Sequence, residues 1–325
     1  MKLLNQFYSN EKSKQTLVNF ITDGRLPHTV LLEGEEGCGK THFARLIACS
    51  VLCKSQEKLC GECRNCRLIM QDKHPDVLVL SPNSPEKPYA AAALRELVLS
   101  CYILPNDGDK KIYILRNINE MSEQSQNTLL KIIEEPPKHT MFILTSTSRA
   151  AVLPTILSRA VSLKLSSCTS ELCAKALLER NPSADEDFCI QLAKQCNGNI
   201  GKALAIMQDE KLSTIYNDAK EAAKLICGGS EFDLLCLLNS YNRKKDDFLE
   251  LLLELREIFV QIIRQKNGSE DKNFISESLL HRISSLQTMR IIDIIDEASS
   301  QTASNVSVAL AGASLCAAIQ KVLEK

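Results

Sequence analysis

The feature that most constrains the fold is a glycine-rich segment at residues 34–41 with the sequence GEEGCGKT. It fits the pattern GxxxxGK[ST] in full. The apolar run TVLL at residues 29–32 precedes it, and a helical pattern follows at residues 41–52. A strand, a glycine-rich turn and a helix in this order form the phosphate-binding loop of many α/β proteins. The segment therefore predicts a strand–loop–helix unit that cradles phosphate.

The residues of this loop have distinct expected roles. Gly34, Gly37 and Gly39 allow positive φ angles, so that successive N–H groups turn inward around a phosphate. Lys40 is expected to reach the β and γ phosphates, and Thr41 is expected to bind Mg²⁺. ATP with Mg²⁺ is therefore a candidate ligand. The alternatives are a glycine-rich turn that arose by chance and a decayed loop that no longer binds.

Short apolar runs and helical patterns alternate up to about residue 165. The runs lie at residues 29–32, 77–80, 111–115, 141–145 and 161–165, and helical patterns at 41–52, 90–101 and 122–135. Apolar strands separated by helices predict a parallel sheet that is covered on both faces. Beyond residue 165 the periodicity is helical to the C-terminus, apart from an expected loop at residues 266–273. The fold class is therefore α/β with a P-loop, followed by helical domains.

The strand expected at residues 111–115 lacks the acids that nucleotide hydrolysis requires. P-loop ATPases hold the metal with an acid just after an apolar strand. Here Arg116 and Asn117 follow the strand, and on an extended chain Glu120 would lie about 10 Å further along. Asp76 precedes its own strand and so lies at the opposite end of the sheet. We expect nucleotide binding at most, with hydrolysis close to nil, unless another strand carries the acid.

Four cysteines are spaced as ligands of a metal ion. Cys53, Cys60, Cys63 and Cys66 follow the pattern C-x6-C-x2-C-x2-C. Two-residue gaps allow thiolates to converge on one ion, and four sulfurs satisfy tetrahedral Zn²⁺. Closed coordination of this kind indicates a structural metal. Random clustering in a chain with 14 cysteines and a thioredoxin-like redox pair are the alternatives.

Charge and composition limit the classes of function. The formal net charge of −1 gives no global basic field, which argues against free-standing, salt-driven nucleic-acid binding. Aromatic residues make up 5% of the chain and tryptophan is absent, so stacking on single strands is not indicated. Neither an apolar run of about 18 residues nor a signal peptide is recognisable. We expect a cytoplasmic protein without a membrane partner.

Three stretches together resemble a known family. They are GRLPHTVLLEGEEGCGKTHFARLIACSVLC at residues 24–53, the cysteine module, and NTLLKIIEEPPKHTMFILTSTSRAAVLPTILSRA at residues 127–160. They resemble the bacterial replicative clamp loaders, which are AAA+ proteins related to the gamma/tau and delta prime subunits of DNA polymerase III. The resemblance covers residues 5–210. Over residues 211–325 only helicity and length match the collar domain of that family.

The resemblance implies a domain organisation and a set of partners. Residues 1–165 would form an AAA+ nucleotide-binding-like domain with a zinc module at residues 53–66. Residues 166–211 would form a helical lid, and residues 212–325 an α-helical collar for oligomerisation. The implied partners are gamma/tau and delta clamp-loader subunits, the sliding clamp and, through the complex, primer-template DNA.

Within this family the chain resembles delta prime more than gamma. Arg116 and Asn117 replace the two Walker B acids of the motor subunits. Gly201 stands where the lid motif of a motor carries an arginine. Thr145, at the end of the strand at residues 141–145, occupies the sensor 1 position. Through the resemblance we expect a subunit whose own ATPase is absent.

The resemblance also assigns a role to Arg159. The sequence Ser158-Arg159-Ala160 corresponds to the Ser-Arg-Cys motif of the family, whose arginine points at the ATP of a neighbouring subunit. The bland alternative is a surface salt bridge. The implied function is a stator subunit that supplies a trans arginine. The alternatives are a gamma/tau-like ATP-hydrolysing motor, a zinc nucleic-acid-binding module with a decayed P-loop, and a small-molecule P-loop kinase.

Overall fold

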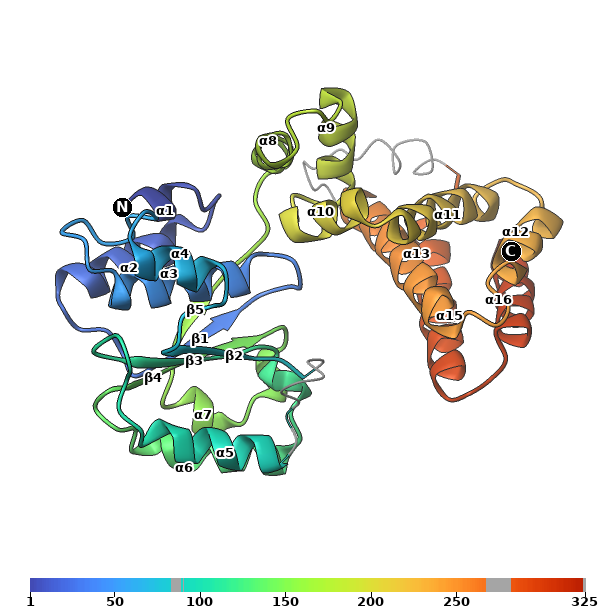
Figure 1. Ribbon diagram of the computed structural model, residues 1–325. Coiled ribbons are helices and arrows are strands. Elements are labelled where there is room, and N and C mark those ends of the chain that lie inside the picture. The colour runs from blue at the N-terminus through green and yellow to red at the C-terminus, as the bar shows by residue number, and fades with distance from the viewer. Residues whose placement is uncertain (83–88, 90, 267–281, 324–325) are drawn as a thin grey trace. The chain divides into compact units, whose positions relative to one another are not determined.

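The computed structural model describes residues 1–82, 89, 91–266 and 282–323 (Figure 1). Contacts divide the chain into two compact units, the first comprising Met1–Ala184 with Asn197–Lys202 and the second Asp185–Cys196 with Ala203–Lys325. The finer division at residues 165 and 211 stays a prediction. The loop predicted at residues 266–273 lies outside the described residues, except for its first residue.

The first unit is built around a five-stranded parallel sheet with the strand order β2-β3-β4-β1-β5. The strands are β1 (Thr29–Glu33), β2 (Val77–Leu80), β3 (Lys111–Leu115), β4 (Thr140–Ser146) and β5 (Val161–Lys164). All residues of the two central strands β3 and β4 are buried, as a sheet covered on both faces requires. The predicted α/β fold class is confirmed, and strand ends differ from the prediction by one residue at most.

Helices cover both faces of this sheet, with α2, α3 and α4 on one face and α5, α6 and α7 on the other (Figure 1). The helices are α1 (Lys2–Asn5), α2 (Glu11–Thr22), α3 (Lys40–Leu52), α4 (Arg64–Met70), α5 (Ala91–Cys101), α6 (Glu123–Glu134), α7 (Pro154–Leu157) and α8 (Ser170–Arg180), with 3-10 turns η1 (Ile118–Glu120) and η2 (Arg149–Ala151). Successive strand residues point to opposite faces. Ile112 and Ile114 of β3 accordingly pack in the core under α3, whereas Tyr113 and Leu115 pack in the core under α6.

The second unit is helical throughout its described residues. Its helices are α9 (Glu186–Gln195), α11 (Glu210–Ile226), α12 (Glu231–Asn239), α13 (Lys245–Lys266), α15 (Ser285–Ala303) and α16 (Val308–Leu323), and α10 (Ile200–Gln208) enters it from the first unit. Phe248 and Phe259 of α13 share one core with Ile291 and Ile295 of α15. Among the described residues no helix combines the length and apolarity needed to cross a bilayer.

Candidate metal centre and phosphate loop

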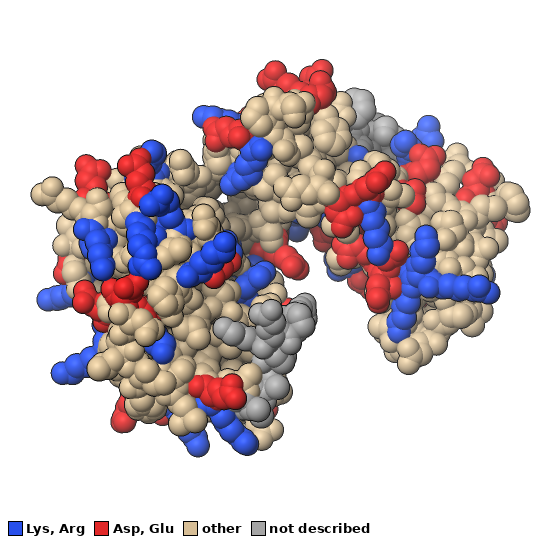
Figure 2. Space-filling view, viewed as in Figure 1, with Lys and Arg blue, Asp and Glu red and all other residues tan. Residues whose placement is uncertain are grey.

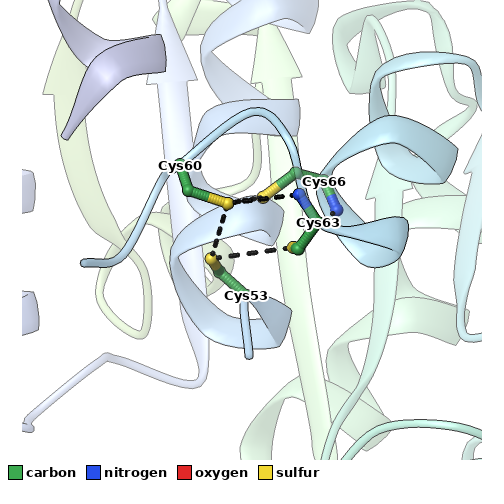
Figure 3. A group of neighbouring side chains, drawn as sticks. All are labelled: Cys53, Cys60, Cys63 and Cys66. Carbon is green, nitrogen blue, oxygen red and sulfur yellow. Dashed lines mark hydrogen bonds between the residues drawn. The ribbon is translucent and has the colours of Figure 1, made fainter. Parts of the chain in front are cut away.

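The four predicted metal ligands come together in the first unit (Figure 3). Their sulfur atoms all lie within 4.8 Å of one another, and the Cys53 sulfur is 3.6 Å from that of Cys60 and 3.9 Å from that of Cys63. The sulfurs of Cys60 and Cys66 are 4.0 Å apart. Four thiolates at a Zn–S distance of about 2.3 Å are about 3.8 Å apart in a tetrahedron. The spacing therefore fits one Zn²⁺ ion.

Backbone amides around the cluster favour thiolates. The N–H of Cys63 donates to the Cys60 sulfur at 3.3 Å, and the N–H of Cys66 donates to the Cys63 sulfur at 3.4 Å. Hydrogen bonds from the amides of Cys63 and Glu62 lower the pKa of Cys60 to about 6. Burial raises the pKa of Cys53 to about 11, and a metal ion would displace that proton because a coordinating thiol is deprotonated.

The loop that carries the ligands is anchored on both sides. The buried Asn65 side chain donates to the carbonyl of Leu52 at 2.8 Å, which ties α4 to the end of α3. On the other side, the Leu3 amide donates to the carbonyl of Leu59 at 3.0 Å. Lys2 forms an ion pair with Glu62 at 2.7 Å. The N-terminal segment therefore packs directly on the metal-binding loop.

The predicted phosphate loop follows β1 and leads into α3. Gly39 caps α3 with a φ of 93°, and no side chain caps the first turn. Free amides at a helix N-terminus suit an anion such as phosphate. Lys40 is only 6% exposed, and its Nζ donates to the carbonyls of Gly34 and Glu35 at 2.7 Å each. Thr41 follows in the first turn of α3, so the predicted order of strand, glycine-rich loop and helix is present, and phosphate binding stays a prediction.

Positive charge stands beside Lys40 where a motor carries acids. The pKa of Lys40 is lowered by burial; the Arg116 guanidinium also lowers it, whereas the charges of Cys38 and Glu36 raise it. Arg116 and Asn117 follow β3, and the amide of Asn117 donates to the buried Thr145 hydroxyl at 2.9 Å. A metal ion beside a guanidinium is electrostatically disfavoured. The residues present thus fit the phosphates of a nucleotide better than its Mg²⁺.

The expectation of an extended chain after β3 is wrong. Residues 118–120 form the 3-10 turn η1, and the Asn117 side chain donates to the Glu120 carboxylate at 2.9 Å. Asn117 adopts a left-handed conformation with a φ of 51°, which starts this turn. Glu120 therefore lies closer to position 117 than sequence distance indicated, although its carboxylate is engaged by an amide.

Asp76 does not supply the missing acid. It lies before β2, is fully buried, and accepts hydrogen bonds from the amides of Asn106, Asp107 and Gly108 at 2.6–3.0 Å. These bonds hold the pKa of Asp76 below its usual value against the opposing effect of burial. The carboxylate is consumed in tying the turn before β3 to the start of β2.

A turn at residues 197–202 binds the outer side of the phosphate loop, a contact that the sequence did not indicate. The buried Asn199 side chain donates to the carbonyl of Glu36 at 2.6 Å. The Gly201 amide donates to the carbonyl of Gly37 at 3.1 Å. A Cβ on Gly201 would lie 2.6 Å from both the Cα and the carbonyl oxygen of Gly37. Glycine at position 201 therefore permits a backbone-to-backbone approach that arginine would prevent.

The predicted trans arginine lies two residues after the last residue of α7, far from the phosphate loop in the sequence. Its Nη1 donates to the carbonyl of Thr155 at 3.0 Å and to the Ser158 hydroxyl at 3.1 Å. Its Nη2 lies 2.9 Å from a carboxylate oxygen of Glu134 at the end of α6. The Arg159 side chain remains 40% exposed. Sequence analysis missed Glu134, although it lies in the quoted EEPP stretch.

The face of the first unit drawn in Figure 2 carries charges of both signs. On the face drawn in Figure 2, lysine and arginine side chains are interspersed with aspartate and glutamate. Arg64 pairs with Asp107, and Arg45 pairs with Asp72 at 2.7 Å. This mixture agrees with the net charge of −1 and gives no support to a nucleic-acid-binding module driven by charge alone.

Comparisons with known proteins agree with this architecture. The family described as "DNA polymerase III, delta subunit" matches residues 9–169. The chain is 33% identical over 196 residues to the tau/gamma subunit of DNA polymerase III from Haemophilus influenzae, covering 58% of this chain and 28% of that protein. It is 30% identical over 199 residues to the delta prime subunit from Bacillus subtilis, covering 61% and 59%.

A solved structure supports the fold. A gamma subunit-related protein of DNA polymerase III from Thermotoga maritima superimposes with a TM-score of 0.54 at 15% identity, covering 95% of this chain and 98% of that one. The chain spans 28%, 29% and 48% of the length of three curated gamma/tau-type relatives that it matches. The motifs, the parallel sheet and these matches together support a place for the chain among the AAA+ clamp-loader subunits of DNA polymerase III.

Proposed function

We propose that this chain is a delta prime-like stator subunit of a DNA polymerase III clamp loader. In this role it assembles with gamma/tau and delta subunits and helps the ATP-dependent loading of a sliding clamp on primed DNA. Its own loop does not hydrolyse ATP, and Arg159 acts on the ATP of a neighbouring subunit. The observation that carries this proposal is the pair Arg116 and Asn117 at the end of β3, beside Lys40.

The chemistry at the end of β3 supports the absence of hydrolysis. Phosphoryl transfer depends on a metal ion and on a group that orients the attacking water. Bound Mg²⁺ would neutralise charge on the phosphates, but Arg116 repels the ion and the Asn117 amide cannot accept a proton. The Thr145 hydroxyl accepts a hydrogen bond from the Asn117 amide, and the Glu120 carboxylate accepts one from the Asn117 side chain.

The exposed arginine supports a role toward a neighbour. The guanidinium is always charged and presents a planar fork that matches phosphate oxygens. With 40% of its side chain exposed, Arg159 is accessible to another subunit, while Thr155 and Glu134 hold its two Nη atoms. An arginine supplied in trans accelerates phosphoryl transfer by about 10³–10⁵-fold.

The cysteine cluster supports a structural Zn²⁺ in this function. Four sulfurs close the coordination shell, so no position is left for a substrate or a reacting water. The ion would cross-link the end of α3 to the start of α4 through Cys53 and Cys63.

A motor subunit of the gamma/tau type is the second candidate, favoured by two observations. The loop has both the lysine and the threonine of the phosphate-binding pattern, Lys40 and Thr41. The turn η1 also places the Glu120 carboxylate within hydrogen-bond distance of the Asn117 side chain. If Glu120 turned toward the phosphates, it could act as the acid. The motor predicts ATP turnover by the isolated chain, and the stator predicts none.

Reconstitution with gamma/tau-type and delta-type partners distinguishes the two functions. If the chain is a stator, Arg159→Ala lowers the ATPase rate by about a thousandfold at the neighbouring subunit's ATP site that Arg159 contacts in the assembled complex. Lys40→Ala changes this rate little. Arg159→Lys keeps the charge but not the fork and serves as the matched control. The reverse pattern, with loss through Lys40→Ala and none through Arg159→Ala, would establish the motor instead.

A further inference from the structure

The guanidinium of Arg159 is held through both of its Nη atoms, and its side chain is 40% exposed. Its Nη1 donates to Thr155 and Ser158 within the same turn, and its Nη2 pairs with Glu134 from α6 at 2.9 Å. Glu134 is the only one of these partners that comes from another helix and carries charge. It therefore fixes the direction in which the guanidinium projects from α7.

We propose that Glu134 is a positioning residue for Arg159, and this inference rests on the proposed function of that arginine. Arginine has many rotamers, and a fork held in one orientation loses less freedom when it binds a phosphate. The carboxylate of Glu134 accepts from Nη2, while 40% of the Arg159 side chain stays exposed. The end of α6 thus aims the arginine before any neighbour binds.

The ion pair is suited to aim the arginine rather than to sequester it. The side chains are 40% and 42% exposed, so water and salt screen their attraction. A screened pair competes weakly with the concentrated negative charge of a triphosphate. Loss of Glu134 should therefore cost orientation, and the arginine should act less often on the neighbour's ATP.

The neighbouring residue provides a matched control. Glu135 has the same charge, lies one residue further along, is exposed, and forms no ion pair within the part of the chain that the structure describes. Glu134→Gln and Glu135→Gln therefore change net charge equally, and only the first removes a partner of Arg159.

The test measures ATP turnover against ATP concentration in the reconstituted complex with clamp and primed DNA. Glu134→Gln is expected to lower kcat by about two- to fivefold, as loss of an exposed ion pair allows, with little change in KM. Glu134→Asp should fall between Gln and wild type, and Glu135→Gln should match wild type. Native mass spectrometry checks that each variant still assembles. If Glu134 had only a structural role, its substitution would reduce assembly instead of kcat.

Two outcomes would overturn the inference, and they are distinguishable. Equal kcat for Glu134→Gln and Glu135→Gln, with a large loss for Arg159→Ala, would remove Glu134 from the account and leave the trans arginine in place. No loss for Arg159→Ala would overturn the proposed function, and the positioning role with it.

Discussion

Two cradles lie in the first unit, and they differ in how their polar groups are satisfied. In the cysteine cluster, four sulfurs converge at the spacing that one metal ion requires. In the phosphate loop, Lys40 binds carbonyls of its own loop, and the turn at residues 197–202 binds the loop from outside. Chain contacts anchor both loops, but the four cysteine sulfurs are placed for a ligand to join them, whereas Lys40 already binds the chain itself.

Removal of one of the proposed zinc ligands should produce the largest effect. Cys60→Ser leaves three sulfurs, and structural zinc contributes about 10 kcal/mol or more to the folding of small domains, so we expect loss of the ion and local unfolding around residues 53–66. Metal analysis and hydrogen exchange of that segment measure both effects. Cys236→Ser, at an exposed cysteine of α12, is the control and should change neither. If residues 53–66 stayed folded and fully protected from hydrogen exchange in metal-free protein, the proposed difference between the cysteine cluster and the phosphate loop would be wrong.

Crowding the contact on the phosphate loop should have an intermediate effect. In Gly201→Ala the new Cβ meets the Gly37 backbone at 2.6 Å, so the turn must shift, at a cost of about 1–3 kcal/mol in the free energy of unfolding. Urea unfolding measures this change. The control is Gly312→Ala in α16, where the nearest atom to the new Cβ is 3.4 Å away, and it should cost less. If Mg²⁺–ATP restored the Gly201 variant fully, the loop would depend on a ligand after all.

Features of the fold and the site that depend on residues close together in the sequence could be predicted, whereas contacts between distant residues could not. Strands and the cysteine cluster are encoded by local patterns, and both appeared where predicted. The position of Glu120 was misjudged because the left-handed conformation of Asn117, which starts the turn η1, is not visible in the sequence. Asn199 and Glu134 were missed because their partners lie 163 and 25 residues away in the chain. No periodic pattern in the sequence predicts such contacts, because the partner residues come together only when the turns pack in the folded chain.

The smallest expected effect is the pH dependence of stability caused by His42, which depends on how well the region beside the phosphate loop excludes water. His42 of α3 stacks on Phe7 at 5.8 Å, and burial, with Arg180 and Arg45, lowers its pKa from 6.5 to about 4. Between pH 4 and 6.5, His42 is protonated in the unfolded chain but neutral in the folded one. The free energy of unfolding is therefore unaffected by His42 near neutral pH and decreases as the pH falls from 6.5 towards 4.

By pH 5.5, one unit below the pKa of the unfolded chain, the expected loss is about 1.4 kcal/mol. Urea unfolding of wild type and His42→Gln at a series of pH values isolates it, because protonation of the cysteine ligands affects both proteins alike. The two proteins should differ in slope over this pH range. Parallel curves would show that His42 is open to solvent and that the region beside the loop is not closed.

The central claim, that this chain does not hydrolyse ATP at its own loop, is tested most directly by the ATPase rate of the isolated, contaminant-free chain. The account predicts that wild type, Lys40→Ala and Glu120→Gln all give the same background rate. Turnover at about 1 s⁻¹ or faster, as ordinary enzymes show, would contradict it if Lys40→Ala abolished that turnover. Its loss in Glu120→Gln as well would identify the acid that Arg116 and Asn117 fail to supply.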